Sequence, residues 1–320
     1  MIVMLDGQRR TMLVVALTVL AWRPTPAHPL EAIDPRPDDA HMGDPTSPVS
    51  PTSTSEPSIS MPPDMQSVPE LVPAVETAPP PVKRIPPRRP RKRGTVFVHG
   101  GGPDATLDQF AALCDAAGPL VLIPTASEGS DREAERDRMR QPWLRRGLRD
   151  VVVLHARDRG EALVDGFAAP LRTASCAWLV GGRQGRLEDR YVGTPVEQEL
   201  HALVRRGGAV GGSSAGSAVL SRVMIHHGNP EPVEGTGFGI LPGIIVDQHF
   251  LARHREPRLV HMLERHPELV GFGIDEATAL VVQGDRWRVV GDSVVRRCTV
   301  ESGCADLPAG ASGRFPGPPE

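Results

Sequence analysis

The sequence GGSSAGSAVL, residues 211–220, joins a strand-like run to a helix-like run and places Ser214 in the turn between them. The residues up to Val210 are typical of the end of a strand, and those from Ala218 onward are typical of a first helical turn. The Gly-x-Ser-x-Gly pattern is typical of a nucleophile elbow, in which glycines make room for a strained serine with an exposed hydroxyl. The alternative is a glycine-rich corner that carries an inert serine.

Upstream of this turn, short apolar runs alternate with amphipathic segments. The strand-like runs are TVFVH (95–99), PLVLIPT (119–125), VVVLH (151–155), AWLVGG (177–182) and 208–211, and the helix-like segments are 106–117, 129–148, 160–173 and 194–206. Downstream of residue 270, strand-like alternation around a Gly284–Asp285 turn is typical of antiparallel hairpins. The sequence therefore predicts an α/β fold: a mostly parallel sheet with helices on both faces, finished by hairpins near the C-terminus.

Two further glycine-rich turns, GGGP at 100–103 and GGRQ at 181–184, follow predicted strands. In α/β folds, sites gather at the carboxyl ends of the strands. Neither turn has the glycine spacing of a dinucleotide site or the lysine of a phosphate-binding loop, so we expect no nucleotide site. No cysteine pair has metal-ligand spacing, so we expect no metal either.

The first third of the chain differs from the rest in composition. Residues 24–81 contain sixteen prolines and few large apolar side chains, too few to offset the entropy lost on folding. Ahead of them, Arg9 and Arg10 precede an apolar run over 12–22, the order of an export signal, and this run is short for a membrane span. A retained membrane anchor is the alternative.

These patterns predict four parts. We expect an export signal peptide over 1–27, a disordered Pro-rich spacer over 28–94, a folded domain over 95–305 and a flexible tail over 306–320. The protein would then be periplasmic or extracellular, without a stable membrane anchor.

The net charge of −3 is unevenly distributed. The segment VKRIPPRRPRKRG (82–94) contains seven cations, whereas the spacer before it is acidic. Such a run can bind nucleic acid, an anionic surface or an acidic polymer, or remain a solvated linker. In an exported chain, nucleic acid is not an expected partner.

Four cysteines, an even number, are compatible with disulfides in an exported protein. Cys298 and Cys304 can close a small loop near the C-terminus. Alternatively, Cys114 and Cys176 are unpaired and serve as buried small apolar residues. The sequence leaves the pairing open.

A serine nucleophile needs a base, and the base needs an acceptor that orients it. His249, in GIIVDQHF (243–250), follows a β-branched strand-like run, although the chain has eleven histidines and residue type alone does not single it out. Glu276, in GFGIDEATAL (271–280), also follows an apolar run and can accept the imidazole N–H. Asp275 can do the same, and either carboxylate can instead cap the following turn.

The strings VHGGG, IPTAS, GGRQ, GGSSAG, ILPGIIVDQHFLARHREPRL and GFGIDEATAL occur in this order over about residues 95–296. This set resembles the cyanophycinase branch of the S51 serine peptidases. The resemblance implies a flavodoxin-like α/β hydrolase of peptide bonds, in which Ser214 attacks, His249 is the general base and Glu276 orients it. It also implies an oxyanion hole made by the backbone N–H groups of Gly182 and Ala215, no metal or organic cofactor, and a homodimer as in many members.

The resemblance further implies substrate contacts at Gln184, Asp247, Gln248, Arg253, Arg255 and Arg258. The arginines can bind a free carboxylate or an aspartate-rich backbone through forked hydrogen bonds, while Asp247 can pair with a substrate guanidinium. Alternatively, these arginines are solvated residues of a loop and of the start of a helix.

The chain departs from the family pattern at a few positions. Arg183 stands where the family usually has an acidic residue or asparagine, and Ser213 replaces a common threonine. Arg183 puts a cation beside the expected oxyanion hole and leaves the dipeptide preference open. Arg186 or Glu188 stands near the place of a family lysine.

The expected function is that of an exported serine exopeptidase releasing β-aspartyl-arginine dipeptides from cyanophycin, multi-L-arginyl-poly-L-aspartate. One alternative is an aspartyl dipeptidase of the same family. Another is a catalytically silent protein that binds an anionic polymer or surface through the basic run. The DQHF string with its arginine cluster favours the polymer, because a small dipeptide needs fewer cations.

Overall fold

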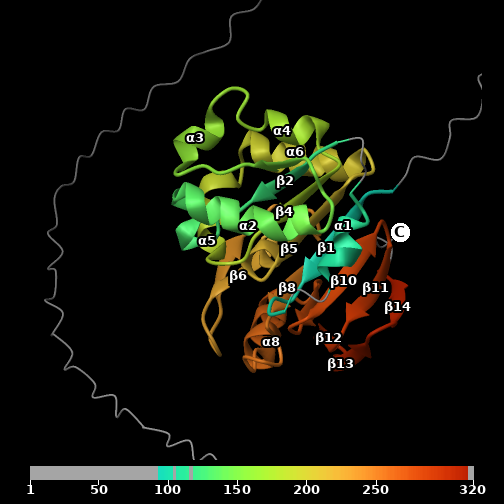
Figure 1. Ribbon diagram of the computed structural model, residues 1–320. Helices are drawn as coiled ribbons and strands as arrows, with labels where there is room; N and C mark the ends of the chain where they lie inside the picture. Colours follow the sequence, from blue (N-terminus) through green and yellow to red (C-terminus); the bar gives the residue numbers. More distant parts are fainter. Residues whose placement is uncertain (1–92, 104–105, 115–117, 316–320) are drawn as a thin grey trace, which may run out of the picture. The chain divides into compact units, whose positions relative to one another are not determined.

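The computed structural model describes residues 93–103, 106–114 and 118–315 (Figure 1). The expected export signal, nearly all of the Pro-rich spacer and residues 316–320 lie outside these ranges. In the part that is described, no helix is long and apolar enough to cross a membrane. This part contains two mixed sheets, and helices cover both faces of the larger one. The predicted α/β class is confirmed.

The larger sheet has eight strands. They are β1 (Thr95–His99), β2 (Leu120–Ile123), β3 (Val151–Val153), β4 (Cys176–Leu179), β5 (Ala209–Ser213), β10 (Thr278–Gln283), β11 (Arg286–Gly291) and β14 (Ser312–Arg314). Their order is β14-β11-β10-β1-β5-β4-β2-β3. The five strands from β1 to β3 in this order are parallel, and β10, β11 and β14 extend the sheet antiparallel, which confirms the predicted hairpin at Gly284–Asp285.

Helices cover the two faces of this sheet (Figure 1). They are α1 (Leu107–Ala111), α2 (Glu133–Arg145), α3 (Arg159–Leu163), α4 (Ala169–Thr173), α5 (Gln184–Tyr191), α6 (Pro195–Arg205) and α7 (Ala215–Ala218), with a 3-10 turn η1 (Glu128–Asp131). A further helix, α8 (Glu256–Arg265), packs on the second sheet. Successive side chains of a strand point to opposite faces. In β1, Phe97 packs with Phe110 of α1, while Val96 and Val98 face the core shared with α3 to α7.

A second sheet has four strands, β8 (Ile244–Gln248), β9 (Val270–Ile274), β12 (Val294–Thr299) and β13 (Gly303–Pro308), in the order β13-β12-β9-β8. Strands β8 and β9 are parallel, and the other pairs are antiparallel. One face carries Phe272, which packs against Trp287 of the larger sheet, and α8 covers the other face. A separate hairpin pairs β6 (Val223–His227) with β7 (Val233–Thr236).

The second sheet corrects the sequence prediction, which placed the strands after residue 270 at the end of a single sheet. Strand patterns locate strands but do not name their partners, and β9 is buried on both faces. The tail predicted over 306–320 is also wrong for residues 306–314. These residues complete β13 and form β14, which pairs in register with β11.

Helix boundaries differ from the predicted segments as well. Within the described residues 106–114, the helix predicted over 106–117 is the five-residue α1, segment 160–173 divides into α3 and α4, and α5 was not predicted. The turn around Ser214 is tighter than predicted, because β5 continues to Ser213 and α7 already begins at Ala215.

Two disulfides account for all four cysteines. Cys298–Cys304 joins the neighbouring strands β12 and β13, as the sequence allowed. Cys114–Cys176 joins the segment after α1 to the start of β4. The alternative of two unpaired buried cysteines is therefore wrong.

Candidate active site

Ser214 occupies a strained turn between β5 and α7. Its backbone angles, φ 53° and ψ −116°, lie in a region that L-residues rarely adopt. A Cβ on Gly212 would lie 2.2 Å from the carbonyl oxygen of Gly216, and one on Gly216 would lie 2.2 Å from that of Leu179. Glycine is therefore required on both sides of the serine, as the Gly-x-Ser-x-Gly pattern predicts.

Three polar side chains form a hydrogen-bonded line at the end of β5. His249 Nε2 lies 2.9 Å from Ser214 Oγ, and His249 Nδ1 lies 2.6 Å from Glu276 Oε1. When Nδ1–H donates to the carboxylate, Nε2 is left to accept a hydrogen bond from the serine hydroxyl. The structure thus brings together the three residues that the sequence analysis named as nucleophile, base and orienting acceptor.

The line crosses from one sheet to the other. Ser214 follows β5 of the larger sheet, whereas His249 follows β8 and Glu276 lies just beyond β9 of the second sheet. Strands β8 and β9 are parallel neighbours and end at the same edge. The carboxylate therefore meets the imidazole, which in turn contacts the serine.

The glycines after β1 lie against this pair of residues. A Cβ on Gly102 would lie 2.8 Å from Glu276 Cβ, and the main chain of Gly100 accepts a 2.8 Å hydrogen bond from the N–H of His249. The GGGP turn therefore supplies a surface without side chains against which the histidine and the glutamate pack. The sequence predicts that this turn lies at the edge where sites gather, but it does not predict that the turn packs against His249 and Glu276.

Asp275, the rival of Glu276, has a different set of partners. Its Oδ1 accepts the N–H groups of Leu251 and Ala252, both at 3.1 Å, and its Oδ2 accepts the hydroxyl of Ser293 at 2.8 Å. Asp275 thus fixes the turn that follows His249. Of the two adjacent carboxylates, Glu276 contacts the imidazole and Asp275 caps the chain.

The surroundings of His249 favour its neutral form. Burial lowers the pKa of the imidazole below its usual value of 6.5, and the positive charges of Arg253 and Arg255 lower it further. The hydrogen bond to Glu276 raises the pKa and only partly opposes these effects. A neutral imidazole at pH 7 is the form that can accept a proton.

Two backbone segments flank the Ser214 hydroxyl where the sequence analysis expected an oxyanion hole. Ala215 directly follows the serine as the first residue of α7, and a Cβ on Gly181 would lie 3.2 Å from Ser214 Cβ. Gly182 has φ 146°, and a Cβ there would lie 2.2 Å from the carbonyl oxygen of Ala126. The segment that contains Ala126 thus packs closely against Gly182 and fixes its position.

A buried hydrogen-bond chain holds that segment. Thr125, next to Ala126, places its Oγ1 2.7 Å from Tyr191 OH and 3.0 Å from His155 Nδ1. His155 Nε2 lies 3.0 Å from Asp131 Oδ1. This chain ties the ends of β2 and β3 to α5, and the sequence analysis missed it because its members lie far apart in the sequence.

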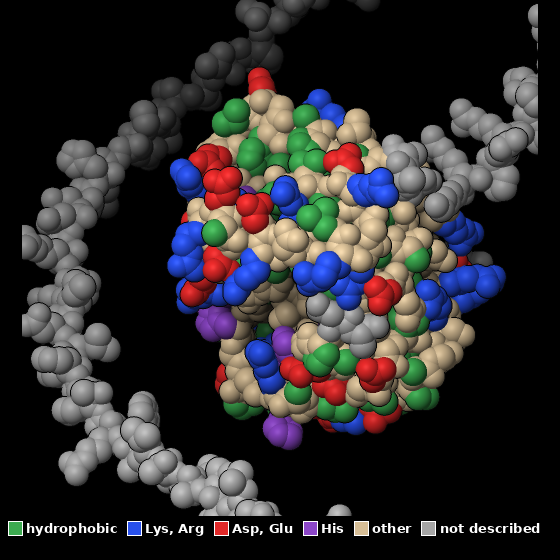
Figure 2. All heavy atoms as spheres, viewed as in Figure 1, with side chains coloured by type: hydrophobic (Ala, Val, Ile, Leu, Met, Phe, Trp, Pro, Cys, Tyr) green, Lys and Arg blue, Asp and Glu red, His purple; other side chains and the backbone are tan. Residues whose placement is uncertain are grey.

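Ser214 opens onto a pocket of about 850 Å³, and Figure 2 shows a hollow bordered by arginine or lysine and histidine side chains. The charged and polar residues that line the pocket are Arg183, Gln184, Arg186, Asp189, Ser214, His226, His227, Asn229, Gln248, Arg253, Arg255 and Arg258. Five arginines therefore face one aspartate. Among the described residues, no group of three His, Cys, Asp or Glu side chains is arranged to hold a metal ion.

Asp247 does not face this pocket as a free carboxylate. It is fully buried, its Oδ2 accepts a 2.7 Å hydrogen bond from Arg258 Nε, and its Oδ1 contacts Arg258 Nη2 and Arg255 Nη1. The expected pairing of Asp247 with a substrate guanidinium is therefore not supported, because arginines of the same chain already occupy both oxygens. Arg258 is itself buried, as is Gln248.

The remaining residues that were expected to contact substrate differ in how many partners their side chains have within the protein. Gln184 donates from Nε2 to the carbonyl oxygens of Ile225 and His226, at 2.9 and 2.6 Å. Arg183 pairs with Glu128 at 3.0 Å on the surface. Arg253 is exposed, and its guanidinium forms no ion pair with any residue that the structure describes.

Burial lowers the pKa of Arg255 to about 10, which leaves it charged at neutral pH. Arg255 Nη1 donates to Asp247 and to the Gln248 carbonyl oxygen, so Arg255 has its other N–H groups left for a ligand in the pocket, beside the exposed guanidinium of Arg253.

An α/β fold that brings a hydrogen-bonded serine, histidine and glutamate together at the ends of its strands has the arrangement of a serine hydrolase. The comparisons with known proteins agree. The family model for peptidase family S51 matches residues 98–290. The chain belongs to peptidase family S51, and it is a serine-type peptidase.

Relatives extend this assignment. The chain is 34% identical over 220 residues to a cyanophycinase of Synechococcus elongatus, covering 64% of this chain and 67% of the relative. It is 33% identical over 218 residues to a cyanophycinase of Geminocystis herdmanii, covering 63% and 79%. The crystal structure of a peptidase from an acI-B1 Actinobacterium superposes with a TM-score of 0.58 and 27% identity, over 70% of this chain and 98% of the other.

Proposed function

We propose that this protein is an exopeptidase that hydrolyses cyanophycin to β-aspartyl-arginine dipeptides. The observation that carries the proposal is the Ser214–His249–Glu276 line, which lies at the mouth of a cation-lined pocket. The cyanophycinase relatives support the choice of polymer. Each repeating unit of this polymer offers a carboxylate and a guanidinium, so a productive pocket has to recognise both.

In the proposed reaction, Ser214 Oγ attacks the scissile carbonyl carbon while its proton passes to His249 Nε2. The tetrahedral intermediate collapses as the imidazolium gives that proton to the leaving amine, which leaves an ester on the serine. Water then attacks the ester, again with His249 accepting a proton, and releases the acid and the free serine. Glu276 holds the imidazole in the required tautomer through the 2.6 Å hydrogen bond.

The negative charge on the carbonyl oxygen needs donors that are already in place. We assign this role to the backbone N–H groups of Gly182 and Ala215. Support comes from the position of Ala215 directly after the nucleophile and from the tight packing of Gly182 against Ala126. Donors on rigid backbone need no reorganisation when the charge develops.

The residues that line the pocket indicate which of them would bind the charged groups of the substrate. Arg253 and Arg255 are the candidates for a substrate carboxylate, which a guanidinium binds through two parallel hydrogen bonds. The candidate for the substrate guanidinium is Asp189, an exposed carboxylate that lines the pocket, because Asp247 is buried against Arg258. Recognition of arginine is thereby assigned to a residue that the sequence analysis did not name.

A second candidate function is aspartyl dipeptidase activity. The pocket lining has one aspartate to bind a substrate guanidinium, and this scarcity of carboxylates favours an acidic ligand without a guanidinium. The two substrates predict opposite responses to loss of Asp189. Asp189→Asn should raise KM for cyanophycin and for β-aspartyl-arginine peptides, and should leave hydrolysis of an α-aspartyl dipeptide without arginine unchanged or improved.

The deciding experiment incubates the full chain with cyanophycin, analyses the products, and repeats the reaction with Ser214→Ala. Release of β-aspartyl-arginine that is lost in the variant supports the proposal. Cleavage of α-aspartyl dipeptides but not of polymer moves the function to the second candidate. Polymer binding without any hydrolysis by the unaltered chain leaves the silent binding protein as the function and rejects both enzymes.

We also propose that the protein is exported. The sequence of residues 1–27 motivates this proposal, and two disulfides involving every cysteine of the chain support it, because such bonds persist in oxidising compartments. Expression of the full chain followed by cell fractionation tests it. Recovery of the protein solely in the cytoplasm, with its cysteines reduced, contradicts export.

A further inference from the structure

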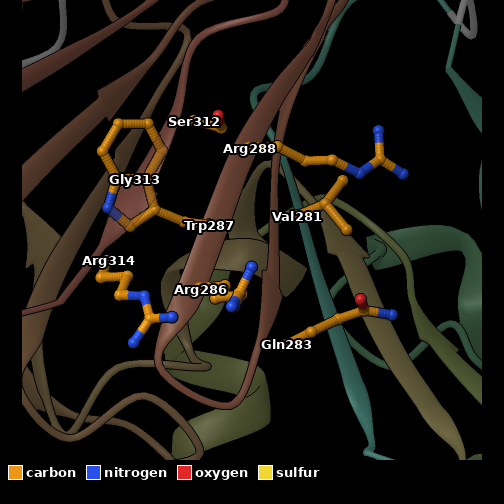
Figure 3. A pocket seen from close by; sticks show the side chains of 8 residues that line it. All are labelled: Val281, Gln283, Arg286, Trp287, Arg288, Ser312, Gly313 and Arg314. Atoms are coloured by element: carbon orange, nitrogen blue, oxygen red, sulfur yellow. The ribbon is translucent and has the colours of Figure 1, made fainter.

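A second cationic surface lies on the larger sheet, away from Ser214. The antiparallel register pairs Arg286 with Gln283 on one side and with Arg314 on the other, and it pairs Arg288 with Val281 and Ser312. Residues directly opposite one another in a sheet point to the same face. The three arginines therefore share one face, where they border a hollow of about 340 Å³ (Figure 3). We call this surface the arginine face.

The arginine face lies at the other end of β1 from the active site. Strand β10 runs antiparallel to β1, so Ala279 pairs with His99 at the active edge while Val282 pairs with Val96 near the opposite end. None of the residues that line this hollow lines the pocket of Ser214. The two sites are therefore separate.

The charges on this face are not balanced by the protein. Asp285 pairs with Arg314 at 3.3 Å and with Arg93 at 2.9 Å, so two guanidinium groups share its carboxylate. Arg286 and Arg288 form no ion pair with any residue that the structure describes. Like charges directly opposite one another across two strands destabilise a sheet, and Arg286 stands opposite Arg314. A bound anion would relieve this repulsion.

The shape of the site favours an extended chain over a compact ion. Arg286 and Arg288 are two residues apart on a strand, roughly 7 Å, which is also the spacing of alternate side chains in an extended peptide. Strand β14 is the last strand of the sheet, so its outer edge can pair with an added strand. Guanidinium groups bind carboxylates through forked hydrogen bonds.

The same geometry disfavours nucleic acid. Trp287 is the aromatic residue in the lining of the hollow, but it points to the opposite face of β11 from Arg288 and packs against Phe272 (Figure 3). Because its ring faces away from Arg288, Trp287 does not offer the arginine face a ring on which a base could stack.

We propose that the arginine face binds an extended polypeptide rich in carboxylates, at a site distinct from the peptidase centre. Six further cations precede Arg93 directly in the sequence, at positions 83, 84, 88, 89, 91 and 92, and they continue the positive charge along the chain. The inference depends on the surface alone. It holds whether the peptidase acts on polymer or on dipeptides.

The test uses the full chain carrying Ser214→Ala, so that nothing is cleaved, and a fluorescent poly-L-aspartate of about ten residues as the probe. Binding is measured by anisotropy at low and at physiological salt. Arg286→Gln combined with Arg288→Gln should weaken binding about tenfold or more. The matched control, Arg145→Gln with Arg149→Gln, removes two exposed arginines of the α2 region and should leave affinity unchanged.

A stability measurement excludes misfolding as the cause. Because the double variant removes repulsion, it should unfold at the same or a higher temperature than the parent, and poly-L-aspartate should raise the midpoint of the parent only. Three outcomes overturn the proposal: no binding by the parent chain, equal loss of affinity in the matched control, or equally tight binding of an oligonucleotide of the same charge.

Discussion

The α-carbon of Gly101 lies against the imidazole of His249, and a Cβ on Gly101 would stand only 2.3 Å from His249 Cε1. Real Cβ contacts do not approach so closely, and Gly101 also has φ 100°, a conformation that L side chains rarely adopt. Gly101→Ala should displace the imidazole and lower kcat/KM at least about 100-fold, because a shift of about 1 Å at a reacting group is that costly.

The control for this change is Gly147→Ala. Gly147 also has positive φ, 85°, but a Cβ there would meet nothing within 4 Å. It should therefore affect stability modestly and leave kcat/KM intact. Full activity of Gly101→Ala would show that the histidine is not held by this contact.

The two neighbouring carboxylates should separate into different phenotypes. Glu276→Gln keeps the shape of the side chain but loses the charge that fixes the imidazole tautomer, so kcat should fall by about 10³ to 10⁴ with little change in the unfolding midpoint. Asp275→Asn weakens the cap on Leu251 and Ala252 and should lower the midpoint as well as kcat. Steady-state kinetics and thermal unfolding measure both. Equal effects of the two substitutions on kcat and on stability would contradict the division of roles.

The acid limb of the pH profile of kcat/KM should reflect the pKa of His249. Burial and the charges of Arg253 and Arg255 lower the pKa of the imidazole, so the limb should lie below pH 6.5. Arg253→Gln removes a cation that disfavours the imidazolium, so the pKa should rise and the limb should move to higher pH. Arg145→Gln removes an exposed arginine at the end of α2 that does not line the pocket, and it should leave the limb in place. A limb that does not move in Arg253→Gln rejects the assignment of the limb to His249.

The buried chain behind Gly182 should influence the chemical step. Thr125→Val keeps the volume but removes the hydroxyl that joins Tyr191 to His155, so two buried polar groups lose a partner, at a cost of about 1 to 3 kcal/mol each. We expect kcat to fall about tenfold with a smaller change in KM, because the segment packs against Gly182, which we propose as an oxyanion donor. Thr125→Ser, which keeps the hydroxyl, should restore kcat. Failure of the serine variant to do so would mean that packing, not the hydrogen bond, matters here.

The two disulfides should differ in their contribution to stability. In the chain-entropy account, the Cys114–Cys176 bond spans 62 residues and stabilises by about 4 kcal/mol, whereas the Cys298–Cys304 bond spans 6 and stabilises by about 2 kcal/mol. Denaturant unfolding of Cys114→Ser with Cys176→Ser, compared with Cys298→Ser with Cys304→Ser, tests the order. A larger loss of unfolding free energy in Cys298→Ser with Cys304→Ser would contradict the expected order.

Local sequence was sufficient for those features that depend on neighbours in the chain. The apolar runs predicted the parallel strands, and the glycines around Ser214 predicted its strained turn, because both follow from side-chain periodicity and backbone sterics. His249 and Glu276 were identified by their positions after strand-like runs and by the resemblance to S51 peptidases. The structure brings both to Ser214.

Features that depend on tertiary pairing were not accessible. The sequence could not tell that β8 and β9 leave the larger sheet, since a buried strand has the same pattern in either place. It could not assign Asp247 to Arg258 in place of a substrate, because a carboxylate beside arginines is compatible with both. The support of His249 by Gly101 and the chain from Thr125 to Asp131 likewise require coordinates, since their members are distant in sequence.

The separation of the site between two sheets ties catalysis to the packing of the core. Ser214 follows a strand of one sheet, whereas His249 and Glu276 follow strands of the other. Both sheets contribute side chains to one core, Val98 and Val210 from the larger and Val246 and Phe272 from the second. A core substitution that shifts one sheet against the other would therefore part the serine from its base, even where it lies far from the reacting atoms.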